Sequence, residues 1–223
     1  MPNNTQAVFD ATASTYDRDR SRLIPGCDRI YSRALELIPA NAKSIVDLGA
    51  GSGLLTILLR QRFPTAHIHL IDFSAPMLAL AKQRLGDDPN LTFTQANYVT
   101  AFLPQQQCAI VSSLSIHHLD DADKRAVYRR SHNALAPGGV FVNADHIAGP
   151  TPEIEALYQQ RWHAEIRALG ASEQQISESL FRQKEDRRSP IEIQLRWLRE
   201  AGFDNADCWF KESSFAVLSG TRS

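Results

Sequence analysis

Three glycines and an acid stand close together in the segment Asp47-Leu48-Gly49-Ala50-Gly51-Ser52-Gly53. Glycine lets the backbone approach a ligand closely, because it carries no Cβ and accepts a positive φ. A helix predicted to begin at Leu54 directs its unpaired N–H groups at the same place. The segment is therefore predicted to bind a ligand through Asp47, Gly49, Ala50 and Gly51.

The spacing of the glycines separates two kinds of ligand. In the dinucleotide fingerprint a third glycine comes three residues after the second, but here Leu54 stands at that position and the third glycine is Gly53. Asp47 would repel a diphosphate, whereas it favours a ligand that carries an ammonium group. S-adenosylmethionine (SAM) has that ammonium group and no diphosphate, so the loop favours SAM over NAD.

A second acid, Asp72, ends a predicted strand about twenty residues after the glycine loop, where an acid accepts hydrogen bonds from the two ribose hydroxyls of a nucleoside. Phe73 follows it and is expected to lie against the adenine ring. The loop and Asp72 together are a stronger indication of a nucleoside ligand than glycines alone, since any tight strand-to-helix turn favours glycine.

Short apolar segments alternate with helical ones in the part of the chain that holds these residues. The pattern predicts strands at 45–48, 68–72, 91–94, 109–111 and 140–143, and helices at 54–63, 76–85 and 122–135. Such alternation is typical of an α/β fold with a doubly wound, mostly parallel sheet covered on both faces. Ligands of these sheets bind outside the carboxyl ends of the strands.

The flanking segments are helical. We expect one domain with an N-terminal helical segment (1–40), a ligand-binding core (41–150), a helical cap (151–190), and a final helix with two hairpin strands (191–223). The cap is interpreted either as a lid over a small-molecule pocket or as helices that complete the core or a dimer face. A homodimer face could use Trp162, Leu169 and Phe181.

The chain resembles the class I SAM-dependent methyltransferases over nearly its whole length. The resemblance implies a seven-stranded sheet whose last strand is antiparallel. It implies Gly49 and Gly51 along the methionine part of SAM, Asp72 on the ribose, and Phe73 with Met77 beside the adenine. The matching segments are Val46 to Gly53, Ile71 to Met77, Gln95-Ala96-Asn97, Ile110 to Leu119, and Leu135-Ala136-Pro137-Gly138-Gly139.

The resemblance also gives roles to five further residues. Many members have an aspartate where Asn97 stands, and the Asn97 carbonyl oxygen can still accept a hydrogen bond from the adenine amino group. Tyr98 is expected to stack nearby, and Ser113 to lie where the sulfur of SAM passes. Tyr16 is expected either to close over the cofactor, as aromatic residues there do in similar enzymes, or simply to pack. Arg22 is expected either to pair with a carboxylate of SAM or of the substrate, or to be solvated on a charged helix.

Within this superfamily the ends of the chain are similar to the carboxy-SAM-dependent enzymes that modify the wobble uridine of tRNA. That family places a carboxylate-recognising arginine shortly after an Ile-Ser pair, which is Ile176-Ser177 here. Leu180 occupies the corresponding place, and Arg182 is the nearest arginine. This departure favours ordinary SAM and methyl transfer, with the product S-adenosylhomocysteine.

Three histidines are candidates for a general base. His117 and His118 follow the fourth predicted strand and His146 follows the fifth, and imidazole titrates near neutral pH. The alternative is a structural role with the rings bonded to backbone. No metal site is predicted, because the histidines are scattered along the sequence and His67 with His69 lacks a third ligand.

Composition limits the partners. The formal net charge of −1 and the absence of a basic run argue against tight nucleic-acid binding. The segment Ser112-Ser113-Leu114-Ser115 is not the Asn-Pro-Pro-Tyr type that positions exocyclic amines, which favours a small-molecule substrate. A polar N-terminus and no apolar run long enough for a membrane indicate a cytoplasmic protein. A tRNA-modifying enzyme and a non-catalytic SAM-binding subunit remain as alternatives.

Overall fold

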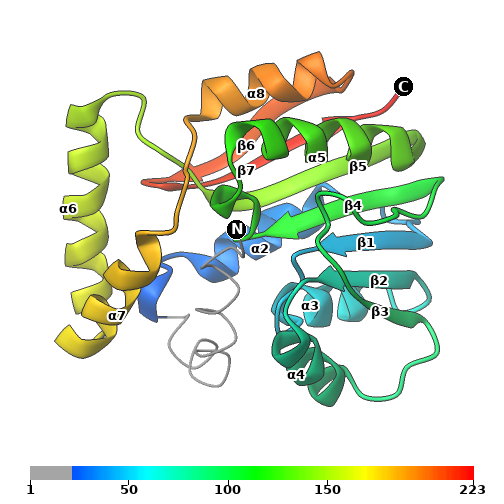
Figure 1. Ribbon diagram of the computed structural model, residues 1–223, viewed down its shortest axis with the longest axis horizontal. Coiled ribbons are helices and arrows are strands. Elements are labelled where there is room, and N and C mark those ends of the chain that lie inside the picture. Colours follow the sequence, from blue (N-terminus) through cyan, green and yellow to red (C-terminus); the bar gives the residue numbers. More distant parts are fainter. Residues whose placement is uncertain (1–21) are drawn as a thin grey trace.

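The computed structural model describes residues 22–223, so Tyr16 lies outside the described residues. Within this range seven strands form one sheet in the order β3-β2-β1-β4-β5-β7-β6 (Figure 1). The strands are β1 (Ser44–Leu48), β2 (His67–Asp72), β3 (Leu91–Gln95), β4 (Gln107–Ser113), β5 (Leu135–His146), β6 (Asp204–Glu212) and β7 (Phe215–Thr221).

The pairing of the strands matches the predicted α/β architecture. Strands β3, β2, β1, β4 and β5 pair in parallel, while β7 runs antiparallel to both β5 and β6. The last strand is thus the antiparallel one. The strand order reverses between β1 and β4, and such a switch point leaves a crevice at the carboxyl ends of the two strands.

Helices cover both faces of the sheet because its central strands are apolar on both sides. Ile45 and Leu70 belong to the core on the face of α2 (Cys27–Glu36), α3 (Leu54–Arg62) and α4 (Ala75–Leu85). Val46 and Ile71 belong to the core under α5 (Asp121–Ala134) and α8 (Ile191–Glu200). The alternation follows from the period of two along a strand.

Strand β5 begins earlier than the sequence predicted. The sequence pattern predicts a helix up to residue 135 and a strand at 140–143, but β5 already begins at Leu135. The register shifts between the pairs Gln107↔Leu135 and Ala109↔Val140, so the extra residues bulge out of the ladder. The N–H of Gly138 donates to the Arg222 carbonyl, which holds this bulge against the end of the chain.

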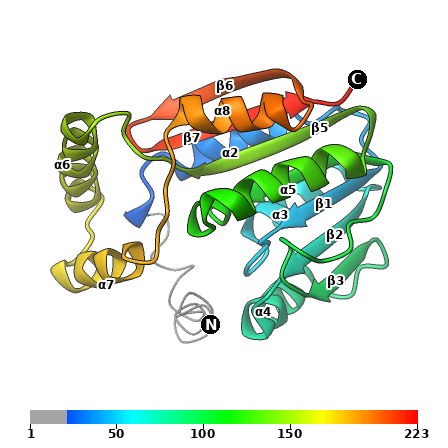
Figure 2. The same cartoon turned by 45° about the horizontal axis from the view of Figure 1, so that its top comes forward.

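Two helices form the cap. Figure 1 and Figure 2 both show α6 (Pro152–Ala168) and α7 (Glu173–Gln183) beyond the carboxyl end of β5 rather than on a face of the sheet. Trp162 of α6 is 3% exposed, and its Nε1 donates to the Leu23 carbonyl at 2.9 Å. Trp162 therefore helps to complete the core, one of the two roles expected for the cap, and of the three residues named for a homodimer face only Leu169 and Phe181 are exposed.

None of the helices within residues 22–223 is long and apolar enough to cross a membrane.

Candidate functional site

The glycine loop has the backbone geometry that only glycine adopts easily. Gly49, Gly51 and Gly53 have φ values of 67°, 55° and 79°. A Cβ on Gly49 would lie 2.0 Å from the Ser115 Oγ, whereas a Cβ on Gly51 would meet nothing within 4 Å. The loop is therefore packed tightly against Ser115 at its start and open to a ligand in its middle.

Asp72 ties the glycine loop to the end of β2. Its Oδ2 accepts a hydrogen bond from the Gly51 N–H at 2.8 Å, and its Oδ1 accepts one from the Ser74 N–H at 2.8 Å. A carboxylate offers about four acceptor sites, so holding the loop and accepting from a ribose are compatible roles. Asp72 thus ends β2, as predicted, and also holds the glycine loop through a hydrogen bond. Its contact with a ribose remains a prediction.

Asp47 lies beneath the loop rather than at its surface. The residue is fully buried in β1, and its Oδ2 accepts a hydrogen bond from the Thr56 hydroxyl of α3 at 2.6 Å. Its side chain joins β1 to the helix that follows the loop. The predicted interaction of Asp47 with an ammonium group is therefore a charge interaction through the loop, without direct contact.

The residues expected near the adenine divide into two groups. Phe73 is half-buried and Met77 is buried, both directly after β2. Asn97 is exposed, and its Oδ1 accepts from the Val99 N–H at 2.9 Å, which closes a local turn. Tyr98 is buried against Gly49, with its hydroxyl 2.9 Å from the Ser115 Oγ. It packs under the loop instead of lying open for stacking.

Two other predicted residues are at least partly exposed to solvent. Ser113 is half-buried at the end of β4, and Arg22 is exposed at the start of the described residues. Ser115, which the sequence analysis did not assign, makes the contacts with Gly49 and Tyr98. A small polar residue after a strand gives no sequence signal for such a contact.

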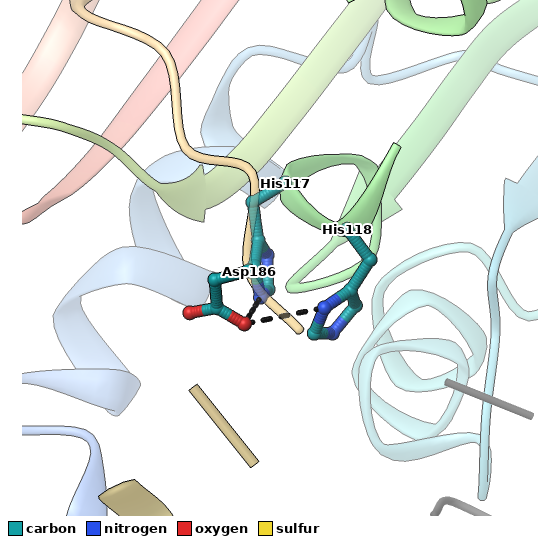
Figure 3. Close-up of side chains that lie close together, drawn as sticks. All are labelled: His117, His118 and Asp186. Atoms are coloured by element: carbon teal, nitrogen blue, oxygen red, sulfur yellow. Dashed lines mark ion pairs between the residues drawn. The ribbon is translucent and has the colours of Figure 1, made fainter. Parts of the chain in front are cut away.

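The three candidate histidines come together with two aspartates. His117 and His118 belong to the short helix η1 (Ile116–His118), and Asp186 follows α7; Figure 3 shows these three side chains close together. His146 ends β5. The Asp186 Oδ1 lies 3.4 Å from the His117 Nε2 and 3.2 Å from the His118 Nδ1. Its Oδ2 lies 3.2 Å from the His146 Nδ1. The expectation that the histidines are scattered is wrong for these three.

Asp145 fixes His117 from the opposite side. Its Oδ1 lies 2.5 Å from the His117 Nδ1, and its Oδ2 accepts from the His117 backbone N–H at 2.9 Å. Both carboxylates that flank His117 are buried, with 4% of each side chain exposed. We call His117, His118, His146, Asp145 and Asp186 the histidine cluster.

The carboxylates and the burial act on the histidines in opposite directions. Burial alone would lower the pKa of His117, but Asp145 and Asp186 outweigh it and raise this pKa to about 10. Burial and the charge of His117 lower the pKa of His118. Burial, assisted by His117 and Arg188, lowers the pKa of His146 to about 4. Of the three rings, His117 therefore holds its proton most strongly.

Asp186 owes its position to a buried lysine on another helix. Lys124 of α5 is 1% exposed, and its Nζ donates to the Arg187 carbonyl and to the Ser189 hydroxyl. The Arg187 N–H donates to the His117 carbonyl at 2.8 Å. The sequence analysis missed Lys124, Asp145 and Asp186. Asp145 directly precedes a candidate histidine, but the run of charges around Asp186 reads as a solvated surface.

We expect Lys124→Met to lower the free energy of unfolding by about 2 kcal/mol, because it leaves buried acceptors without a donor. Arg125→Met is the matched control, since Arg125 is the next residue of α5 and pairs with Glu200 at the surface. An exposed pair contributes at most about 1 kcal/mol. Urea unfolding followed by circular dichroism measures both; equal losses would contradict the role of Lys124.

A cavity of about 80 Å³ opens beside the histidine cluster. It lies at the carboxyl ends of β4 and β5 and reaches the cap, so it occupies the side of the sheet where parallel strands bind ligands. Its lining residues are Leu23, Ile24, Leu114, His117, His118, His146, Trp162, Ser179, Arg182, Gln183, Asp186 and Phe215. The cavity and the glycine loop thus lie at the same edge of the sheet, with Leu114 in the cavity wall and the next residue, Ser115, against Gly49.

The sequence is similar to known proteins over much of its length. Residues 45–139 match the methyltransferase domain family. The carboxy-S-adenosyl-L-methionine synthase of Chromohalobacter salexigens is 30% identical over 188 residues, or 78% of this chain and 66% of that protein. The demethylmenaquinone methyltransferase of Chlamydia caviae is 30% identical over 135 residues, or 60% of this chain and 57% of that protein.

The fold is also found among solved structures. Phosphoethanolamine N-methyltransferase 2 of Haemonchus contortus, in complex with SAM, superposes with a TM-score of 0.72 at 15% identity. The match covers 98% of this chain and 60% of the other. At this identity the likeness concerns the fold, and it confirms the predicted doubly wound sheet.

Proposed function

Because the chain belongs to the class I SAM-dependent methyltransferases, we propose that it transfers the methyl group of SAM to a small molecule. The nucleophile is an oxygen, nitrogen or carbon atom of that substrate. Methyl transfer from a sulfonium is an in-line displacement, so the enzyme contributes by positioning the two reactants and excluding water.

The observation that carries this proposal is the junction between the loop and the cavity. Ser115 lies against Gly49, and the next residues along the chain are the helix η1 with His117 and His118. A methionine moiety along Gly49 and Gly51 would therefore end beside the mouth of the cavity. A substrate atom in the cavity would meet the methyl group there.

We assign each part of SAM to a successive segment of the sequence. The glycine loop holds the methionine part of SAM, Asp72 accepts from the ribose hydroxyls, and the residues after β2 and β3 lie around the adenine. Two of the predicted contacts, those of Arg22 and Tyr16, concern the N-terminal part of the chain and remain predictions. The proposed set is Asp47, Gly49, Ala50, Gly51, Asp72, Phe73, Met77, Asn97 and Ser113, with Tyr98 as support under the loop.

The lining of the cavity and the charge of the chain support a small-molecule substrate. The cavity has apolar walls with a few polar side chains that converge on it, as is typical of sites for small molecules. The formal net charge of −1 offers no footprint for a nucleic-acid backbone. A cytoplasmic location remains a prediction.

Transfer of a labelled methyl group tests the proposal. The purified chain is incubated with SAM that carries a labelled methyl group, in parallel with a small-molecule extract and with total tRNA. We expect the label in a low-mass product and in no tRNA. Label in tRNA alone would contradict the substrate class, and SAM binding without transfer to either pool would indicate a non-catalytic subunit.

A second candidate function is the conversion of SAM to carboxy-SAM, with a carboxylic-acid co-substrate as the source of the added carboxyl group. It is favoured by the 30% identity with the carboxy-SAM synthase of Chromohalobacter salexigens and by Arg182, which lines the cavity and could pair with a carboxylate. Leu180, at the place of that family's arginine, argues against it. Mass spectrometry of the ligand retained on purification separates the two, since only the second candidate predicts bound carboxy-SAM.

We expect His118→Ala to slow methyl transfer by about 100-fold, within the range found for side chains that act on a reacting proton, and to leave SAM affinity unchanged. His67→Ala is the control, because His67 is exposed on β2 and bonds Thr92 away from the cavity. Single-turnover rates and SAM titrations measure the two quantities. Near-normal transfer by both His118→Ala and His146→Gln would contradict a role of the cluster in the chemistry.

A further inference from the structure

Three potential metal ligands of the histidine cluster face one another at the cavity wall. The His117 Nε2, the His118 Nδ1 and the Asp186 Oδ1 belong to groups whose ligand atoms all lie within 4.8 Å of one another (Figure 3). The oxygen lies 3.4 Å from the first nitrogen and 3.2 Å from the second. Two ligands about 2.1 Å from a tetrahedral ion are about 3.4 Å apart, so both separations fit a shared ion.

Hydrogen bonds from neighbouring residues orient the proposed metal ligands. The carboxylate of Asp145 accepts from the His117 Nδ1–H at 2.5 Å, which leaves the Nε2 of that ring facing Asp186. Metal-binding histidines characteristically donate their other N–H to a carboxylate in this manner. The arrangement orients the ring without occupying its second nitrogen.

The ligand carboxylate is oriented in the same way. The Arg188 Nη1 lies 3.3 Å from the His146 Nε2, and because arginine can only donate, that nitrogen is the acceptor. The proton of His146 is then on Nδ1, which donates to the Asp186 Oδ2 at 3.2 Å. His146 is thus a positioning residue: it holds the Asp186 Oδ2, so that the Asp186 Oδ1 faces the nitrogens of His117 and His118.

The charges around the cluster favour a dication. Arg188 pairs with Glu155 at 2.9 Å, and Lys124 lies 3.5 Å from Asp121. The close ion pairs of Asp145 and Asp186 are with the histidine rings rather than with these two cations. A divalent ion between the rings would balance the charges of both buried carboxylates.

We propose that His117 Nε2, His118 Nδ1 and Asp186 Oδ1 bind one divalent ion of the zinc class. Two imidazoles and one carboxylate are a ligand set of catalytic zinc sites, in which a fourth position stays open. Here that position faces the cavity, because all three residues line it. A bound ion polarises an oxygen ligand and lowers the pKa of a bound hydroxyl group or water. A role of the ion in catalysis rests on the proposed function, whereas the binding of the ion does not.

Titration of the metal-free full chain tests the proposal. The chain is treated with a chelator, desalted, and titrated with Zn²⁺ by calorimetry and with Co²⁺ by visible absorption. We expect one Zn²⁺ per chain and the intense absorption of a four-coordinate Co²⁺ site. A wild-type chain that binds no Zn²⁺ overturns the proposal. The histidine cluster would then be held by its hydrogen bonds alone.

Variants assign the site. Asp186→Asn is expected to lower Zn²⁺ affinity by more than 100-fold, and Asp145→Asn, which removes only an orienting contact, by about 10–100-fold. His67→Ala is expected to leave it unchanged. Zn²⁺ affinity that is unchanged in both aspartate variants overturns the assignment, and the Co²⁺ spectrum of Asp145→Asn distinguishes a reoriented ligand from a collapsed fold.

SAM binding is measured on the same metal-free chain. If SAM binds and Zn²⁺ does not, the metal inference falls and the proposed function stands. If Zn²⁺ binds with the expected variant pattern and SAM does not, the metal site is supported and the proposed function falls.

Discussion

Replacing Asp72 by alanine is expected to weaken SAM binding about 100-fold while the sheet stays folded. The carboxylate would accept from two ribose hydroxyls, and two hydrogen bonds to a charged group contribute about 1.5 kcal/mol each, or about 100-fold together. The same side chain holds the Gly51 and Ser74 N–H groups, so its loss also loosens the loop. Calorimetric titration of SAM into the variant measures the change.

Asp87→Ala is the control for this experiment, because Asp87 is an exposed acid after α4. We expect its SAM affinity to equal that of the unchanged chain. Circular dichroism of the Asp72 variant establishes that the fold is retained. An unchanged SAM affinity in a folded Asp72→Ala chain would show that the ribose site has been assigned wrongly.

Gly49→Ala is expected to abolish measurable SAM binding and to lower the free energy of unfolding by about 3 kcal/mol. A side chain at φ 67° costs about 1–2 kcal/mol, and insertion into a packed site costs about 1–3 kcal/mol more. The new Cβ would stand 2.0 Å from the Ser115 Oγ, so Ser115 and its contact with Tyr98 must move. Chemical unfolding and SAM titration measure the two effects.

Gly170→Ala separates backbone strain from contact. Gly170 has a φ of 81° at the end of α6, but a Cβ there meets nothing within 4 Å, so only the strain remains and SAM binding is unaffected. Adding Ser115→Gly to Gly49→Ala removes the atoms in the way and should recover part of the stability. A Gly49→Ala chain no less stable than Gly170→Ala would contradict the packing described for the loop.

The fold could be predicted from the sequence because its signals are local. Apolar strands such as β1 and β2 end at Asp47-Leu48 and at Asp72, and glycine or proline follows at the turns. The early start of β5 could not be predicted, because Pro137-Gly138-Gly139 is typical of a turn; in the structure it forms a bulge within β5 and bonds to Arg222. That contact joins residues far apart in the sequence.

The candidate site also has a part that could be predicted from local sequence and a part that could not. The glycine loop and Asp72 could be predicted, since their roles depend on the residues next to them. The histidine cluster could not, because Asp186 reaches it from beyond α7 and is held there by Lys124 on α5. Both are charged residues in polar segments, and only the tertiary structure shows that their side chains are buried.

Calorimetric titration of the purified chain with SAM and S-adenosylhomocysteine, with NADH as the control ligand, tests the central claim most directly. We expect micromolar binding of the two sulfur nucleosides and none of NADH, because the glycine spacing and Asp47 disfavour a diphosphate. Failure of both SAM and S-adenosylhomocysteine to bind would mean that the glycine loop serves only the fold or another ligand, and the proposed function would then be wrong.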